Sequence, residues 1–415
     1  MNHTDVMNHT DIKKIAEEQL PLLLFTIPSV AIALFAIFIP GQCIYDEQHV
    51  LLNTQNFVSG ATKWWDFKNH RGAMGPGYAW IHAVVWNLIP NITYLRLCNC
   101  VLLITSAVFV SRIKPFNWTA GAVLLSFPGI WVSGALALTE VYSIFILSVA
   151  LWLASKPLKP KYQWLILGVS IGLACFSRQT LLAVTPAFFI LAMSEKFMQR
   201  SKNWKPILLA GAIAILIPMP MFYGWGGLLP VDDSAHEQIT SHGRFSMINM
   251  IYSISYMLIL FGALVKEIRD EVTKNKWLFL MYIGIGWIIA MILGYEYLPM
   301  KSALIQLTGP ELSKSLATAF PALSIGITLL LVTRLFLNRI EHIKKITREN
   351  PIIIFSALCV ILTILSNGAI THQFSSRYLT VCAPFLAVLL RSKKITLVAV
   401  LGLILLNLAS ILSYL

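Results

Sequence analysis

Apolar runs long enough to cross a membrane recur along almost the whole chain, and they constrain the fold more than any other feature. From Pro21 to the last residue, runs of about 17 to 25 residues, the length that spans a bilayer, follow one another with short polar breaks. Apolar residues make up 57% of the 415 and charged residues 12%, roughly half the charged share of a soluble domain. We therefore predict an all-α, polytopic membrane protein.

Short clusters of Lys and Arg separate the apolar runs and predict the orientation, because such clusters stay in the cytoplasm. Placing them inside gives about thirteen transmembrane helices, with the N-terminus inside and the C-terminus outside. The net charge of +13 is then a property of cytoplasmic loops, and we predict no nucleic-acid partner. The predicted spans cover residues 21–40, 95–112, 118–137, 140–155, 162–177, 180–194, 207–226, 246–265, 277–294, 316–335, 351–368, 377–391 and 395–414.

The predicted topology divides the chain into three parts. Residues 1–20 form a polar cytoplasmic N-terminus, residues 21–391 a transmembrane domain with its first outer loop at 41–94, and residues 392–415 a C-terminal transmembrane helix. Within the loop, Met74 to Ile89 is apolar but short and contains two tryptophans, which predicts a helix lying in the outer interface. The six cysteines have no zinc-binding spacing, and we predict no metal and no cofactor.

Two adjacent carboxylates, Asp46 and Glu47, directly follow the first predicted helix. Polar groups gathered beside hydrocarbon are costly and usually mark a site. A carboxylate there could act as a general base that takes a proton from a sugar hydroxyl. The alternative interpretation is a solvated pair of loop acids.

A second polar segment of the first loop interleaves aromatic and hydrogen-bonding side chains. Trp65, Asp66, Lys68 and His70 lie close together ahead of a Gly-Pro-Gly-Tyr sequence at 75–78. A sugar ring stacks its C–H face on an aromatic ring while its hydroxyls make hydrogen bonds, so this mixture suits a carbohydrate. A belt of interfacial tryptophans that anchors the loop is the alternative.

Two arginines lie at predicted helix boundaries on the outer side. Arg178 is followed by Gln179, and Arg377 by Tyr378. An arginine at such a boundary is costly unless it reaches the headgroups or meets an anion. Its planar guanidinium is well matched to a phosphate. Phosphate binding and simple extension to the headgroups both remain open for each arginine.

Taken in order, these motifs resemble those of the GT-C superfamily of polyprenyl-phosphate-sugar-dependent glycosyltransferases. Within it, they are most similar to the family that adds the terminal α-1,2-glucose from dolichyl phosphate glucose. The chain departs from that family in having Phe67 where the family has proline and Ser177 between Phe176 and the arginine. The matching motifs are Tyr45-Asp46-Glu47, Gln55, Trp65-Asp66-Phe67-Lys68, Gly75-Pro76-Gly77-Tyr78, Leu138-Thr139-Glu140, Arg178-Gln179-Thr180, and Arg377-Tyr378 before Pro384.

The resemblance implies an inverting transfer of a hexose, glucose in that family, from a polyprenyl phosphate. Asp46 would be the base, Glu47 its electrostatic partner and Glu140 a second acid, while Arg178 and Arg377 would hold the lipid phosphate. The short chain without a soluble domain resembles bacterial members that act in the inner membrane, with a periplasmic site. The expected partners are a polyprenyl-phosphate-linked sugar donor, a glycan or lipid-linked glycan acceptor such as O-antigen or another envelope glycan, and membrane lipid.

Two other classes stay open. A transporter or flippase would also have many spans, but it often contains internal repeats and helices broken at the midplane, and here the polar residues gather on one side. A polysaccharide polymerase would carry its large outer loop late in the chain. The large outer loop predicted here is the first one.

Overall fold

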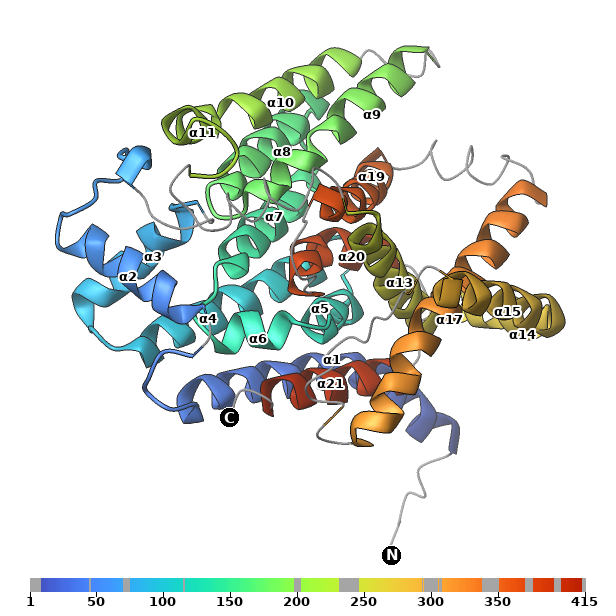
Figure 1. Cartoon of the computed structure of the whole chain (residues 1–415). Coiled ribbons are helices and arrows are strands. Elements are labelled where there is room, and N and C mark those ends of the chain that lie inside the picture. The colour runs from blue at the N-terminus through green and yellow to red at the C-terminus, as the bar shows by residue number, and fades with distance from the viewer. Residues whose placement is uncertain are drawn as a thin grey trace, which may run out of the picture.

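The computed structural model contains helices and connecting turns, and no strand occurs in the part of the chain that it describes (Figure 1). Six helices are long and apolar enough to cross a membrane, and a seventh forms if a bent pair counts as one span. The prediction of an all-α membrane protein is confirmed. The described residues are 9–44, 46–69, 75–114, 116–197, 203–230, 246–292, 294, 305, 308–337, 351–369, 376–391 and 397–412.

Most of the helices lie within the predicted apolar runs. In chain order they are α1 (His9–Phe38), α2 (Glu47–Val58), η1 (Phe67–Asn69), α3 (Gly77–Leu88), α4 (Ile92–Ser111), α5 (Trp118–Ser126), α6 (Ile130–Ala135), α7 (Glu140–Ala154), α8 (Pro160–Cys175), η2 (Gln179–Val184), α9 (Pro186–Phe197), α10 (Trp204–Leu216), α11 (Met219–Trp225), α13 (Met247–Leu264), α14 (Lys266–Lys274), α15 (Lys276–Ile292), α17 (Pro310–Leu337), α19 (Pro351–Ser366), η3 (Asn367–Ala369), η4 (Ser376–Cys382), α20 (Ala383–Leu390) and α21 (Leu397–Leu412).

The predicted count of thirteen spans is not confirmed, because several predicted spans are short or broken helices. The run 118–137 divides into α5 and α6 at Phe127-Pro128-Gly129, where Gly129 has a φ of +85°. Proline removes a backbone donor, and only glycine adopts that φ without cost. The run 140–155 gives the 15-residue helix α7, about 22 Å long at 1.5 Å per residue.

Local sequence signals fix where the helices begin. The side-chain oxygen of Asn91 accepts a hydrogen bond from the Thr93 amide at 2.9 Å, and Asn117 accepts one from Thr119 at 2.8 Å. These caps satisfy amide groups that a helix leaves open at its first turn. They place the starts of α4 and α5 at fixed points of the chain.

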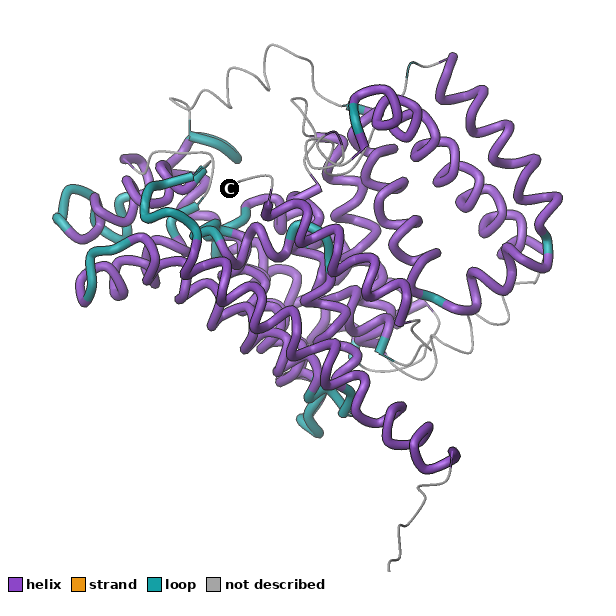
Figure 2. The backbone as a smooth tube through the Cα atoms, turned by 90° about the horizontal axis from the view of Figure 1, so that it is seen from below, coloured by secondary structure: helices purple, strands orange, loops and turns teal. Residues whose placement is uncertain are grey.

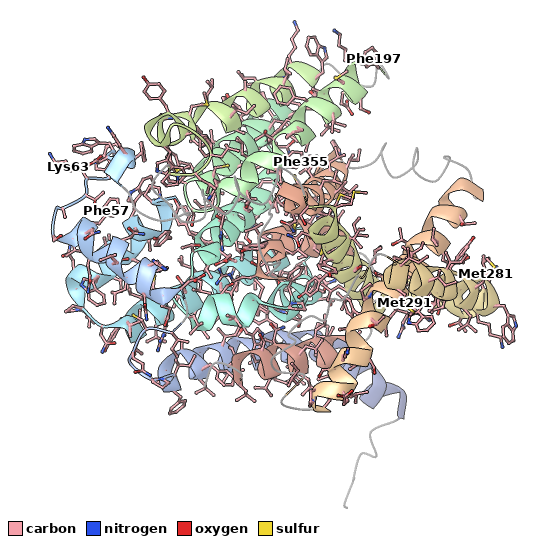
Figure 3. All side chains as sticks on the ribbon, in the orientation of Figure 1. Phe57, Lys63, Phe197, Met281, Met291 and Phe355 are labelled. Atoms are coloured by element: carbon pink, nitrogen blue, oxygen red, sulfur yellow. The ribbon has the colours of Figure 1, made fainter. Side chains whose placement is uncertain are left out.

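The helices α4, α7, α8 and α10 pack in sequence through the middle of the molecule, and α1 and α21 lie beside each other along one side of it (Figure 1). Seen from below, the described chain is a body of packed helices joined by turns and loops (Figure 2). The helices α13, α14, α15 and α17 contact one another on another side of the molecule, and α13 also packs against α19 and η3. Phe355 lies within the packed region and is fully buried (Figure 3), whereas Phe197, Met281 and Met291 are exposed at its periphery. Exposed apolar side chains of this kind suit a lipid environment.

The first predicted outer loop is folded rather than extended. It contains two 12-residue helices, α2 and α3, joined through η1. The sequence predicted only the second of them. Both helices are too short to span, and α3 packs against α2 and α4. The location of α3 in the membrane interface stays a prediction.

Candidate functional site

Four charged side chains from distant parts of the chain meet in one cluster. Arg377 Nη2 lies 2.6 Å from Asp46 Oδ2, and Arg377 Nε lies 2.8 Å from Glu140 Oε1. Arg178 Nη2 pairs with the same Glu140 oxygen. Arg377 therefore bridges the two carboxylates. We call these four residues the site cluster.

The members of the site cluster differ in exposure. The Asp46 side chain is 30% exposed, the two arginines 10% each and Glu140 only 1%. Glu140 Oε2 has no hydrogen-bond partner among the described residues. Glu140 is thus a buried counterion for both guanidinium groups, and Asp46 is the member that a substrate can reach most readily.

The turn that carries Arg178 is held on two sides. Helix α8 ends at Cys175, and the Ser177 hydroxyl donates to the Thr139 carbonyl at 2.7 Å. The Gly77 amide donates to the Phe176 carbonyl at 2.7 Å. These bonds tie the turn to the residue before Glu140 and to the start of α3.

Glycine is required in the Gly75-Pro76-Gly77 sequence because the Phe176 turn packs directly on it. A methyl group added at Gly77 would lie 3.0 Å from the Tyr142 ring and 3.1 Å from the carbonyl carbon of Phe176. Distances this short force the neighbours to move. The motif that resembles a sugar-binding sequence therefore supports the Arg178 turn.

Arg377 rests on the break between α5 and α6. A side chain at Gly129 would approach the Arg377 backbone and would lie 3.1 Å from Thr380 Cγ2. The Gly129 amide donates to Asn407 Oδ1 at 3.1 Å, and Asn407 Nδ2 donates to the Ser126 carbonyl at 3.0 Å. Helix α21 thus holds the broken helix against which Arg377 lies.

The Glu47 side chain turns away from the site cluster and into the protein. Its carboxylate forms a fully buried ion pair with Arg96, with Nε to Oε1 at 2.8 Å and Nη2 to Oε2 at 2.7 Å. Among the described residues, no ion pair joins Glu47 to the side chain of Arg377. Its predicted role as the electrostatic partner of Asp46 stays untested.

The remaining predicted binding residues lie around the cluster or outside the described part. Trp65 is 55% exposed and packs edge-on against Trp64, while Lys63 lies over its ring. No contact in the described residues joins the ring to the site cluster. Asp66, Gln179 and Tyr378 are half-buried, Lys68 is exposed, and His70 lies outside the described residues.

The segment with Trp65 reaches the site through its neighbour Phe67. The Phe67 ring stacks on Phe176 with centroids 5.7 Å apart, and its carbonyl accepts a hydrogen bond from Trp225 Nε1 at 2.9 Å. The residue that replaces the family's proline therefore packs directly behind the Arg178 turn.

A buried histidine links α3 to α4 next to this region. His82 Nε2 donates to Asn99 Oδ1 at 2.9 Å, since the Asn99 amide nitrogen is used on the carbonyls of Ser133, Leu136 and Leu138. Burial lowers the pKa of His82, against the smaller opposing effect of the Asn99 bond. The ring is therefore neutral, and its role is to join α3, α4 and the α6–α7 connection.

Sequence reasoning missed Arg96, Asn99 and Asn407. Each is a polar residue inside an otherwise apolar run and is fully or almost fully buried. Such residues are expensive in a membrane and tend to be paired with a specific partner. A search for isolated polar residues within the predicted spans would have found all three.

No group of three or more His, Cys, Asp or Glu residues close enough to hold a metal ion occurs in the described ranges. The charges available at the site are two carboxylates and two guanidinium groups. Guanidinium groups are suited to planar, two-point contacts with phosphate oxygens.

No protein-family model matches the chain, and no curated protein matches it. Two solved structures resemble it in fold. ArnT from Cupriavidus metallidurans bound to undecaprenyl phosphate shares 14% identity, with 89% of this chain and 77% of that chain covered and a TM-score of 0.39. The archaeal oligosaccharyltransferase AglB from Archaeoglobus fulgidus, in complex with an inhibitory peptide and a dolichol-phosphate, shares 11% identity over 96% of this chain, with a TM-score of 0.41. The chain spans about half the length of AglB (55%).

Proposed function

We propose that this protein is a membrane glycosyltransferase that moves a hexose, most simply glucose, from a polyprenyl phosphate to a glycan or lipid-linked glycan. The observation that carries the proposal is the bridge made by Arg377 between Asp46 and Glu140, with Arg178 on the same Glu140 oxygen. It brings a candidate base, a buried acid and two candidate phosphate-binding groups together from four segments of the chain.

The reaction requires a base, a sugar carbon and a phosphate leaving group in one line. The acceptor hydroxyl oxygen forms a bond to the anomeric carbon, the bond from that carbon to the phosphate oxygen breaks, and the hydroxyl proton passes to Asp46. The electron pair leaves with the polyprenyl phosphate. Positioning reactants in this way can supply much of the barrier reduction.

The two arginines act on the leaving group. Negative charge grows on the phosphate oxygens as the bond to the sugar breaks, and fixed donors aimed at that charge lower the barrier. Arg178 and Arg377 are held by Glu140, which is buried and keeps both guanidinium groups in place. No step of this mechanism is assigned to a metal.

The contact between Arg377 and Asp46 gives donor binding a second effect. A phosphate is an anion that competes with the Asp46 carboxylate for Arg377 Nη2. When the phosphate takes that donor, Asp46 loses its partner and becomes available to the acceptor hydroxyl. The base is therefore freed in the complex that needs it.

Transfer from a defined donor tests the proposal. Purified full-length protein in detergent is given radiolabelled undecaprenyl-phosphate-glucose together with envelope membranes from cells that lack the gene. Transfer of label into glycan, with release of undecaprenyl phosphate, supports the proposal. The same protein is also reconstituted into lipid vesicles. Movement of the intact donor across the vesicle membrane without transfer supports the transporter alternative instead.

We propose that the protein lies in a bacterial inner membrane with the site cluster on the periplasmic side. The support is the separation of the basic clusters from the acidic segments along the sequence. Single cysteines at Lys68 and Glu311, in a background without reactive native thiols, should react with an impermeant reagent in intact cells. A cysteine at Lys274 should not react until the membrane is opened. The opposite pattern would reject this orientation.

A further inference from the structure

A closed network of hydrogen bonds surrounds the ion pair of Glu47 and Arg96. Both side chains are fully buried. Arg96 uses all five of its N–H donors, two on Glu47 and the others on backbone carbonyls near the end of α1. Those carbonyls belong to Ile39 at 3.2 Å, Pro40 at 2.8 Å and Gln42 at 2.9 Å.

The Glu47 carboxylate also has a hydrogen-bond donor at each of its acceptor positions. Glu47 Oε1 accepts from Arg96 and from the Ala137 amide at 2.8 Å, and Oε2 accepts from Arg96 and from the Ile44 amide at 2.9 Å. A buried ion pair stabilises a fold only when its remaining donors and acceptors are satisfied. Here every donor of the guanidinium and both oxygens of the carboxylate are used.

The network joins four segments, and two of them lead directly into the site cluster. Asp46 is the residue before Glu47, and Ala137 lies three residues before Glu140 on the connection to α7. One carboxylate therefore holds the backbone on both sides of the gap that Arg377 bridges. The bridge requires contacts of 2.6 and 2.8 Å at once, so it tolerates little change in that gap.

We infer that Arg96 and Glu47 form a positioning clamp that sets the spacing between Asp46 and Glu140, and that neither residue contacts the substrate. The inference rests on the proposed function. It changes the role predicted for Glu47, because the buried carboxylate has no capacity left for an acceptor or a phosphate.

Two conservative substitutions test the clamp. Glu47→Asp keeps the charge but shortens the side chain by one methylene, and Arg96→Lys keeps the charge but offers three donors in place of five. The matched control is Arg112→Lys, at the exposed other end of the same helix α4. Each full-length variant is purified in detergent beside the unaltered protein.

Turnover of undecaprenyl-phosphate-glucose is measured per folded molecule, together with the Kd for undecaprenyl phosphate. The clamp predicts that kcat falls about 10- to 100-fold in both variants, since misplacement by about 1 Å can cost that much. The Kd should change less than about 3-fold, because neither clamp residue contacts the phosphate. The control should behave like the unaltered protein.

Amide hydrogen exchange separates positioning from a general loss of stability. Exchange should rise in residues 40–47 and 136–140 and remain as before elsewhere. Unchanged kcat in both variants, or a uniform rise in exchange with kcat falling only as the folded fraction falls, would overturn the clamp. If Arg96→Lys fails to fold, Glu47→Asp carries the test. Absence of transfer by the unaltered protein would reject the proposed function instead.

Discussion

Two arginine–carboxylate groups begin at neighbouring residues and have opposite characters. The clamp of Glu47 and Arg96 is fully buried, and each of its polar atoms has a partner. The site cluster is partly open: Asp46 is 30% exposed, and one oxygen of Glu140 has no hydrogen-bond partner among the described residues. A satisfied network contributes rigidity, whereas an incomplete one leaves capacity for a ligand. The difference favours a structural role for the buried pair and leaves the site cluster as the candidate for chemistry.

The largest effect should follow from removing the proposed base. Asp46→Asn keeps the shape but cannot accept the proton, so kcat should fall roughly 10²- to 10⁴-fold. Thermal stability in detergent should hardly change. The measurement is glucose transfer at matched protein amounts, with Glu311→Gln as a control at an exposed acid.

A substitution at the neighbouring carboxylate, Glu47, should affect stability more than Asp46→Asn does. Glu47→Gln should lower the melting temperature clearly, because it leaves Arg96 buried without its counterion. Unaltered transfer by Asp46→Asn would remove that residue from the mechanism. Equal loss of stability in the two variants would contradict the division into a structural and a chemical group.

Arg377→Lys should have the next largest effect, about 10²-fold in kcat over KM. A lysine offers donors on a single nitrogen, which cannot reproduce the two-point bridge from Nη2 to Asp46 and from Nε to Glu140. The control is Arg391→Lys, at the end of the following helix α20. Full activity in Arg377→Lys would mean that only its charge matters, as expected for an arginine that reaches the headgroups.

Much of the fold could be predicted because a membrane imposes few choices. Long apolar runs must become helices, so α4, α15 and α19 lie close to their predicted spans. The break between α5 and α6 was missed, although Pro128-Gly129 signals it. The break is set by the backbone conformation of one or two residues, and hydropathy averaged over a long window of residues does not detect it.

The site was predictable in part. The sequence order of Asp46, Glu140, Arg178 and Arg377 carried enough resemblance to group them, and the structure brings these four together. The sequence could not show that Glu47 turns into the protein while Asp46 stays at the site, because that depends on a partner of Glu47 49 residues away. Arg96 is recognisable as a charged residue within an apolar run, but its pairing with Glu47 is set by helix packing.

A smaller effect is expected from crowding the support of the Arg178 turn. Gly77→Ala places a methyl group against the Tyr142 ring and the Phe176 backbone, and a shift of a few tenths of an ångström should lower kcat about 5- to 10-fold. Gly284→Ala, in α15, is the control, since nothing lies within 4 Å of its added methyl group. Transfer assays on both variants compare them, and equal activity would show that the turn position is not critical.

The smallest effect on activity should come from α21. Asn407→Leu leaves the Gly129 amide and the Ser126 carbonyl without their side-chain partner, which should cost about 1 to 3 kcal/mol of stability. Transfer should fall only about 2- to 3-fold, because Arg377 keeps its own carboxylate contacts. Thermal unfolding followed by fluorescence measures the loss of stability, and the transfer assay measures the loss of activity. Leu405→Ala, at an exposed position of the same helix, should change neither.

The hydrogen bond between Gly129 and Asn407 also affects the order in which the protein can fold during its synthesis. The two residues are 278 positions apart, so a ribosome must add all of the intervening chain before the broken helix receives its support. Arg377 emerges late as well, 331 residues after Asp46. The early helices can enter the membrane and pack while the chain is still being made, but the bridge across the two carboxylates forms only when synthesis has passed Arg377. The site cluster is therefore complete only after most of the chain has been made.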